Sequence, residues 1–230
     1  MKEEFYSLLK SEMKTTTLLV FQAAITVILI MSAMQQDDFV NNMLPHAMPT
    51  WLVYDPAQFE SIEQFLTMYP PSRVPMSRHP WIYVGKTSGH LHPGNVQELL
   101  REWGSFSETR RPSQQLLLYL AEKHKVLAGK WMIYANHYEV DDAWDRIAKL
   151  VSKGKLGVAA KVSPYSPSQM LHCICVYNNN FLDKKEIKEV RQQLRDIGFT
   201  TMLEYKPDAY THLGIYPGNK WHIPEGLYRE

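Results

Sequence analysis

Two amphipathic helical segments in the C-terminal half, each lying between β-rich runs, constrain the fold of this chain most strongly. They run over Asp141–Ser152 and Asp183–Ile197, and apolar residues recur in both at three- and four-residue intervals. An aspartate can cap each helix at its start, and Gly154 or Gly198 follows its end. Each apolar stripe must be buried, and the adjacent β-rich runs offer the surface for it.

Five β-rich runs accompany these helices, and they do not alternate strictly with them. The runs begin at Lys130, Gly157, Leu171, Thr201 and Thr211. Such an order is typical of α+β proteins, whereas a parallel sheet requires regular alternation of strand and helix. We therefore predict an α+β fold, with one curved, mainly antiparallel sheet and both helices packed on the same face.

The region upstream is less regular but carries the same kinds of signal. Short strands are predicted at Trp51–Tyr54 and Trp81–Val84. Helices are predicted after Pro56, over Asn95–Trp103 and over Pro112–Val126.

The N-terminus contains an apolar run over residues 18–34, close to the lower limit of about 17 residues for a spanning helix. The run fits a signal-anchor, a signal peptide, a packed helix or an upstream extension of the reading frame. We expect residues 1–47 to be an extension outside the core fold and residues 48–230 to form a single α+β domain. A membrane is a partner only if the 18–34 run is a true span.

Composition excludes several classes of protein. The chain has 25 Lys plus Arg against 24 Asp plus Glu, so no bulk charge attracts nucleic acid, although a local basic patch remains open. Only two cysteines are present, too few for a disulfide scaffold or a four-cysteine zinc site. Cys173 and Cys175 are two apart in a β-rich run, so both should be buried thiols on one face. Reduced thiols indicate the cytoplasm, with the nucleus also open.

Catalytic motifs are not found in the sequence. The one close histidine pair, His90 and His92, has no evident partner cluster, and zinc needs three or four ligands. The glycine spacings lack the lysine-serine ending of a phosphate loop, and no nucleophile elbow occurs. We expect a non-enzymatic protein with no metal and no cofactor.

The sequence features typical of binding sites are clearer than those of catalytic sites. A basic stripe with flanking acids follows the helix 183–197, and it fits a phosphate-binding face as well as a solvated salt-bridged one. The segment Tyr205–Tyr210 combines two aromatics, a base and an acid around a proline, so it fits either a structural corner or a ligand site.

Several uncommon blocks in the same order resemble the basophilic-leukaemia-expressed protein family, an uncharacterised family of small eukaryotic proteins. The resemblance runs from about Met48 to Tyr228. The blocks are Trp51–Asp55, Tyr69–Ser72, Gly129–Met132, Val162–Pro164, Ile174–Tyr177 and Tyr205–Tyr216.

This resemblance implies a fold similar to the cap-binding translation initiation factor 4E and a role in RNA binding without enzymatic activity. Cap-binding proteins hold methylguanine between two tryptophans, one of them followed by a carboxylate upstream of the position of Gly129. The corresponding stretch here, Tyr119–Lys123, has no tryptophan, so the full cap-stacking pair is not expected.

The sequence thus leaves two functions open: a low-specificity RNA-binding protein, or a protein–protein interaction module on the same fold. Salt dependence of binding distinguishes them. The candidate phosphate-binding residues are Lys130, Lys161, Lys188, Arg191 and Lys206, and the candidate base-stacking residues are Tyr177, Tyr205 and Tyr210.

Overall fold

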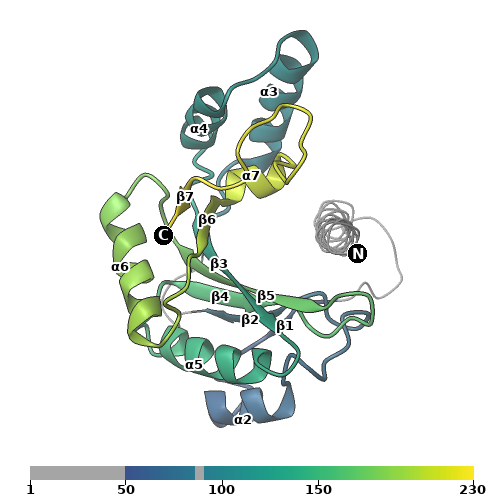
Figure 1. The fold of residues 1–230 in the computed structure, drawn as a ribbon, viewed down its shortest axis with the longest axis vertical. Helices are drawn as coiled ribbons and strands as arrows, with labels where there is room; N and C mark the ends of the chain where they lie inside the picture. The colour runs from purple at the N-terminus through teal and green to yellow at the C-terminus, as the bar shows by residue number, and fades with distance from the viewer. Residues whose placement is uncertain (1–49, 86–90) are drawn as a thin grey trace, which may run out of the picture. The chain divides into compact units, whose positions relative to one another are not determined.

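Seven strands form one sheet in a computed structural model that describes residues 50–85 and 91–230 (Figure 1). The order across the sheet is β1-β2-β4-β5-β3-β6-β7, and every pair is antiparallel except the parallel pair β1–β2. The predicted α+β fold with a mainly antiparallel sheet is confirmed. The strands are β1 (Leu52–Val53), β2 (Ile82–Gly85), β3 (Gly129–Asn136), β4 (Ala159–Val162), β5 (Leu171–Asn178), β6 (Glu204–Pro207) and β7 (Tyr228–Arg229).

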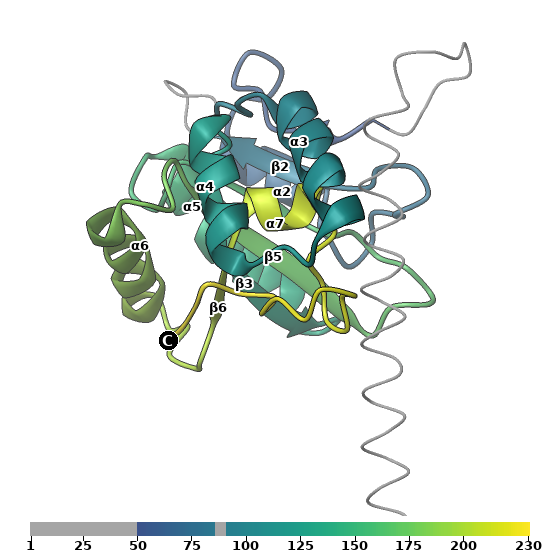
Figure 2. The same cartoon turned by 90° about the horizontal axis from the view of Figure 1, so that it is seen from above.

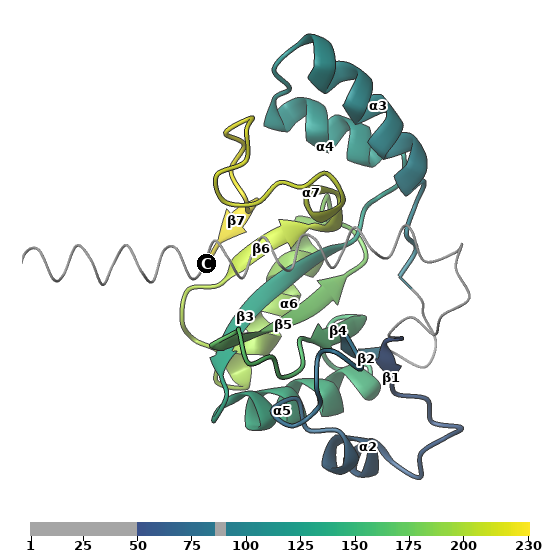
Figure 3. The same ribbon diagram turned by 90° about the vertical axis from the view of Figure 1, so that its right-hand side faces the viewer.

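The helices fall into two groups. One lies along a single side of the sheet, as Figure 1 shows, and consists of α2 (Ile62–Met68), α5 (Val140–Ser152) and α6 (Lys184–Asp196). The other lies towards the β6–β7 edge, as Figure 3 shows, and consists of α3 (Val96–Thr109), α4 (Gln114–Lys123) and α7 (Asp208–His212).

The predicted packing of α5 and α6 on the same face is correct. Trp131 of β3 points to that side, where its Nε1 donates to the backbone oxygen of Ile187 on α6 (3.1 Å). The apolar stripes of both helices are buried there, together with the alternate residues Ile133 and Ala135 of β3. Burial of these stripes is the main favourable free energy that attaches the helices to the sheet.

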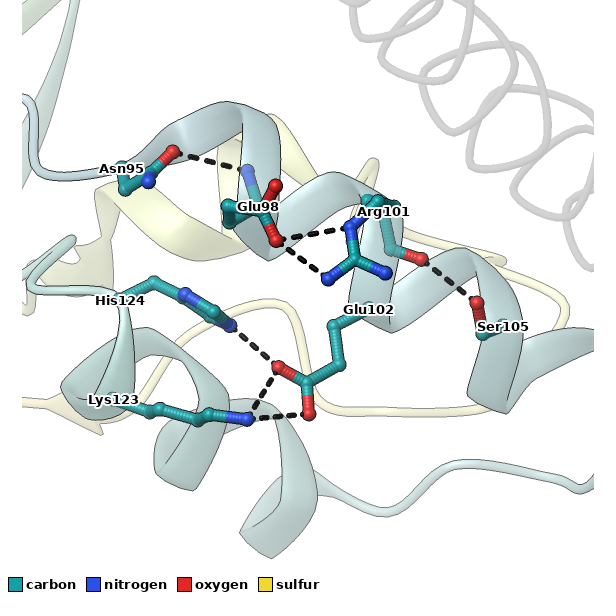
Figure 4. A network of polar contacts seen from close by, with 7 residues as sticks. All are labelled: Asn95, Glu98, Arg101, Glu102, Ser105, Lys123 and His124. Atoms are coloured by element: carbon teal, nitrogen blue, oxygen red, sulfur yellow. Dashed lines mark hydrogen bonds and ion pairs between the residues drawn. The ribbon is translucent and has the colours of Figure 1, made fainter.

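Helices α3 and α4 lie side by side, as Figure 2 shows, and a charged network joins them (Figure 4). The carboxylate of Glu102 on α3 accepts from Lys123 Nζ (2.7 Å) and lies 2.6 Å from His124 Nε2. Within α3, Glu98 accepts from Arg101, and the Asn95 side chain caps the helix by accepting from the Glu98 backbone N–H.

Two predictions about local structure are wrong. Residues 211–216 do not form a strand: Pro207 in extended conformation is followed by the short helix α7, and the chain then turns at Gly214, where φ is +68°. Asp141 does not cap α5, because this helix begins at Val140. The Asp141 carboxylate accepts instead from the backbone N–H and the hydroxyl of Ser72 (2.9 and 2.5 Å), which attaches the chain after α2 to α5.

Upstream, the predicted elements are present with shifted ends. The helix expected after Pro56 begins only at Ile62, because Ser61 is its N-cap and accepts from the Gln64 backbone N–H. Within residues 50–85 and 91–230, no helix is long and apolar enough to cross a membrane. The apolar run 18–34, the boundary expected after residue 47, and His90 lie outside the described residues.

Candidate ligand-binding face

Strand pairing places three lysines on the side of the sheet opposite α5 and α6, which we call the lysine face. Lys130 of β3 is paired with Lys206 of β6, and Lys161 of β4 with Cys175 of β5. Alternate residues of a strand share a face, so these pairs bring distant parts of the chain together. The lysine face consists of Trp51, Trp81, Tyr83, Lys130, Met132, Tyr134, Lys161, Cys173, Cys175, Tyr177, Glu204 and Lys206.

Lys161 has an unusual environment. Its side chain is 4% exposed, and its ammonium lies over the rings of Trp51 (4.7 Å) and Trp81 (3.9 Å). Among the described residues, no hydrogen-bond acceptor or carboxylate reaches this ammonium. Burial, followed by repulsion from Lys130, lowers its pKa to about 8. Cation–π contact offsets part of the cost of burying this charge, and a bound anion or a thiolate at the neighbouring Cys175 would offset more of it.

Lys130 has an acidic partner. Its Nζ donates to Asp208 Oδ1 (2.6 Å) and to the Thr211 hydroxyl (3.0 Å), both from α7. Burial alone would lower the pKa of Lys130, but the Asp208 carboxylate outweighs that effect and raises it. Burial would likewise raise the pKa of Asp208, and the charge of Lys130 lowers it instead. This ion pair attaches α7 to the sheet.

Lys206 bonds to a neutral backbone oxygen, whereas Lys130 bonds to a carboxylate. Its Nζ donates to the backbone oxygen of Ile215 (2.7 Å) and lies 3.9 Å from the centre of the Tyr216 ring. Burial, with repulsion from Lys130, lowers the pKa of Lys206 to about 7. Near neutral pH this amine is therefore poised between its charged and neutral forms.

The two cysteines are buried free thiols on the same face, as the sequence predicted. Their sulfurs are 3.8 Å apart, and Ile174 between them points into the helix-side core. A hydrogen bond from the Cys173 thiol lowers the pKa of Cys175, and the charges of Lys130 and Lys161 lower it further. The same arrangement raises the pKa of Cys173.

A cavity of about 650 Å³ lies at the β6 end of the lysine face. Tyr216 and the carboxylates of Glu204 and Glu225 line it, and Arg229 bridges these two carboxylates at 3.1 and 3.2 Å. At the opposite end of the face, Tyr134 is 52% exposed. The exposed parts of the face therefore lie at its two ends, while the three lysines between them are nearly buried.

Four of the predicted site residues meet on this face. Lys130, Lys161 and Lys206 are all nearly buried there, and Tyr177 lies beside Lys130, whose ammonium is 5.4 Å from the centre of the ring. Sequence spacing alone did not indicate that these residues converge, because they come from four different strands.

The other predicted site residues lie elsewhere. Tyr205 and Tyr210 are fully buried, where their hydroxyls bond to Asn178 (2.6 Å) and Gln114 (2.9 Å), so neither ring is available to a base. Arg191 is also buried, and its guanidinium donates to the backbone oxygens of Phe199, Thr201 and Glu230. Lys188 is exposed on α6, on the other side of the sheet. We exclude these four residues from the candidate site. The two tyrosines and Arg191 are held by buried hydrogen bonds, and Lys188 lies on the other side of the sheet.

Sequence reasoning overlooked the aromatic residues around Lys161. Trp51 and Trp81 are 6.4 Å apart between ring centres with an angle of 56° between their planes, and Tyr83 lies 6.0 Å from Trp51. The alternation Trp81-x-Tyr83 at a strand start could have indicated that both rings share a face. Among residues 50–85 and 91–230, no group of three histidine, cysteine or acidic side chains is arranged to hold a metal ion.

The fold and face define an α+β protein with a mainly antiparallel sheet, α5 and α6 on one side, and a lysine- and aromatic-rich face on the other that α7 and the loop after it partly cover. Residues 98–214, half of the chain, match the profile of the family described as basophilic leukemia-expressed protein Bles03. The chain belongs to this family, as the sequence blocks predicted.

Two solved structures are similar to part of the chain. They are schistosome eIF4E complexed with m7GpppA and 4E-BP, and schistosome eIF4E complexed with m7GpppG and 4E-BP. The TM-score is 0.36 for both, with 17% and 16% sequence identity respectively. Each alignment covers 45% of this chain and 58% of the other chain, so it spans little more than half of those proteins.

Proposed function

We propose that this protein binds RNA without catalysing a reaction, with low sequence specificity, through the lysine face. The observation that carries the proposal is the ammonium of Lys161, which is nearly buried and has no acidic or hydrogen-bonding partner among the described residues. A buried unpaired charge destabilises a protein, and a phosphate oxygen at this position would relieve that cost.

The neighbouring groups support the same ligand. Lys206 adds a second amine without a carboxylate contact, Lys130 adds a charge that Asp208 partly offsets, and Tyr83 is a half-buried ring next to Lys161. Ammonium groups neutralise any phosphate, and an aromatic ring accepts any base, so such a surface tolerates sequence variation.

The geometry argues against a slot for a methylated cap. Two rings that hold a base between them must be nearly parallel, whereas Trp51 and Trp81 are tilted by 56°. The Lys161 ammonium already lies over both rings, 4.7 and 3.9 Å from their centres. We therefore expect a methylated cap analogue to compete no better than GTP.

The test is fluorescence anisotropy of a short labelled single-stranded RNA with the full chain at several salt concentrations. Lys161→Gln should weaken binding on the order of tenfold, the value of one charge-assisted hydrogen bond. It should also lower the slope of log affinity against log salt by about 0.7, because one phosphate contact is lost.

Lys188→Gln is the matched control, because it removes the same charge from the exposed side of α6. It should leave binding at the lysine face unchanged. Undetectable binding at low salt, or equal effects of both substitutions, would refute RNA binding at this face.

One observation favours a second candidate, a protein–protein interaction module. Exposed apolar side chains gather near the Tyr134 end of the sheet, where Tyr138 is 94% and Met170 is 83% exposed. The His137 ring contacts both Tyr138 and Tyr165, which keeps these aromatics together. Binding of a partner there should be largely insensitive to salt.

Either function suits a reducing compartment such as the cytoplasm or nucleus, where Cys173 and Cys175 stay as thiols.

A further inference from the structure

The Cys173–Cys175 pair is a nucleophilic group that RNA binding does not use. Both side chains project from β5 onto the lysine face, because residues two apart on a strand point the same way. Their sulfurs approach to 3.8 Å, close enough for a thiol to donate a hydrogen bond to a thiolate. The chain contains no other cysteine.

The cross-strand neighbours of the pair favour thiolate at one sulfur. Cys175 is opposite Lys161 on β4 and Met132 on β3, while Cys173 is opposite Tyr134. Lys130 adds a second positive charge on this face, partly offset by Asp208. Reactive cysteines lie in positively charged, partly exposed surroundings. Cys173 and Cys175 have the positive surroundings but are buried, so an oxidant must be small enough to enter the face.

We propose that Cys173 and Cys175 form a reversible oxidation site for peroxides, in which Cys175 is the attacking and Cys173 the resolving thiol. The inference does not depend on the proposed RNA binding.

The reaction balances in two steps. The Cys175 thiolate attacks one peroxide oxygen, the O–O bond breaks, and the leaving oxyanion takes a proton from the Lys161 ammonium, which solvent later restores. Cys175 is then a sulfenic acid. The Cys173 sulfur attacks the Cys175 sulfur, the S–O bond breaks, and the hydroxide leaves as water with the Cys173 thiol proton. The two thiols lose two electrons, and the peroxide is reduced to an alcohol, or to water from hydrogen peroxide.

A disulfide here would be reversible and would not brace the fold. Residues two apart in a strand have Cα atoms about 6.6–6.8 Å apart, at the upper end of the range that disulfides tolerate. Strained disulfides are readily reduced, which is a property of switchable bonds. The bridge would enclose a single residue, Ile174, so it would restrict the unfolded chain very little.

The experiment treats the reduced full chain with one equivalent of hydrogen peroxide and follows intact mass. We expect a monomer lighter by two hydrogens and without free thiol, restored by dithiothreitol. Cys173→Ser should instead gain one oxygen at Cys175, trapped by dimedone. Cys175→Ser should react on the order of tenfold more slowly, because the remaining thiol lacks thiolate character. The Lys161→Gln variant, with both cysteines present, should react more slowly than the wild-type protein, and the Lys188→Gln variant should react at the wild-type rate.

Equal rates for the two serine variants would overturn the proposal, as would a wild-type product that is only a cross-linked dimer or a singly oxidised thiol. If a serine variant does not fold, brief alkylation of the wild-type protein decides, with the labelled position read from fragment ions. Modification of Cys175 at least severalfold ahead of Cys173 supports the proposal, and equal labelling contradicts it.

Discussion

At the scale of single residues, close contacts across the sheet set the limits of substitution. Gly129 of β3 lies against Tyr205 of β6, whose hydroxyl donates to Asn178 on β5. A Cβ at position 129 would overlap the Tyr205 hydroxyl and ring carbon. The glycine is therefore required by the approach of a buried tyrosine, and the tyrosine is held there by its hydrogen bond.

Gly129→Ala should destabilise the protein by about 1–3 kcal/mol, the usual cost of overpacking a core. Gly104→Ala on α3 is the matched control, since no atom lies within 4 Å of its Cβ, and it should stabilise by roughly 0.5–1 kcal/mol. Urea denaturation measures both. In a Tyr205→Phe background, the loss caused by Gly129→Ala should shrink, because the overlapping hydroxyl is gone; an unchanged loss would contradict this explanation.

At the scale of elements, the α3–α4 pair shows how charge links two helices that pack against each other and against α7. Glu102 connects α3 to both Lys123 and His124 at the end of α4 (Figure 4). Glu98, in contrast, pairs with Arg101 of its own helix. Hydrogen bonding from Lys123 and then His124 lowers the pKa of Glu102. Of these two glutamates, Glu102 joins two helices, whereas Glu98 stays within one.

Glu102→Gln should lower the melting temperature at pH 7 more than Glu98→Gln does, because the former removes an interhelical contact. A carboxyl whose pKa is lowered on folding contributes stability above its unfolded value of about 4.3, and this is lost as the pH falls through the lower folded value. The difference between the two variants should therefore vanish in acid. Melting curves at pH 7 and pH 3 measure it; a difference that persists at pH 3 would show that packing, not charge, is responsible.

At the scale of the whole molecule, the lysine face couples folding, protonation and ligand binding. Burial lowers the pKa of Lys161 to about 8 and that of Lys206 to about 7, against about 10.4 in an unfolded chain. Between these values the unfolded state binds more protons than the folded state, so folding stability increases with pH. A bound anion favours the protonated amines, so binding should change in the opposite direction.

We expect the free energy of unfolding to rise between pH 7 and pH 9 while RNA affinity falls over the same interval. Cys175, whose pKa is lowered, changes stability in the same direction, whereas Cys173, whose pKa is raised, opposes it above about pH 8.5. Lys206→Met should flatten the stability profile, because it removes the group with the larger shift. Urea denaturation and anisotropy titration at matched ionic strength measure the two profiles. Parallel changes in stability and affinity would contradict the coupling.

Local sequence pattern determined the α+β class, the positions of α5 and α6 and their common face, because an amphipathic stripe specifies its own burial. The pairing of Cys173 and Cys175 on one face followed from the strand period alone. These features depend on residues within one or two turns of each other. The family was also evident from short blocks of sequence, and residues 98–214 confirm it.

Only the tertiary structure decided which of the basic and aromatic residues form a site. Tyr205 and Arg191 look like ligand-binding groups in sequence, yet each is consumed by buried hydrogen bonds to distant parts of the chain. Lys161 meets Trp51 and Trp81 only because the sheet places β1, β2 and β4 next to one another. Burial and partner geometry depend on strand order and register, and these are set by the packing of the whole sheet rather than by any local pattern.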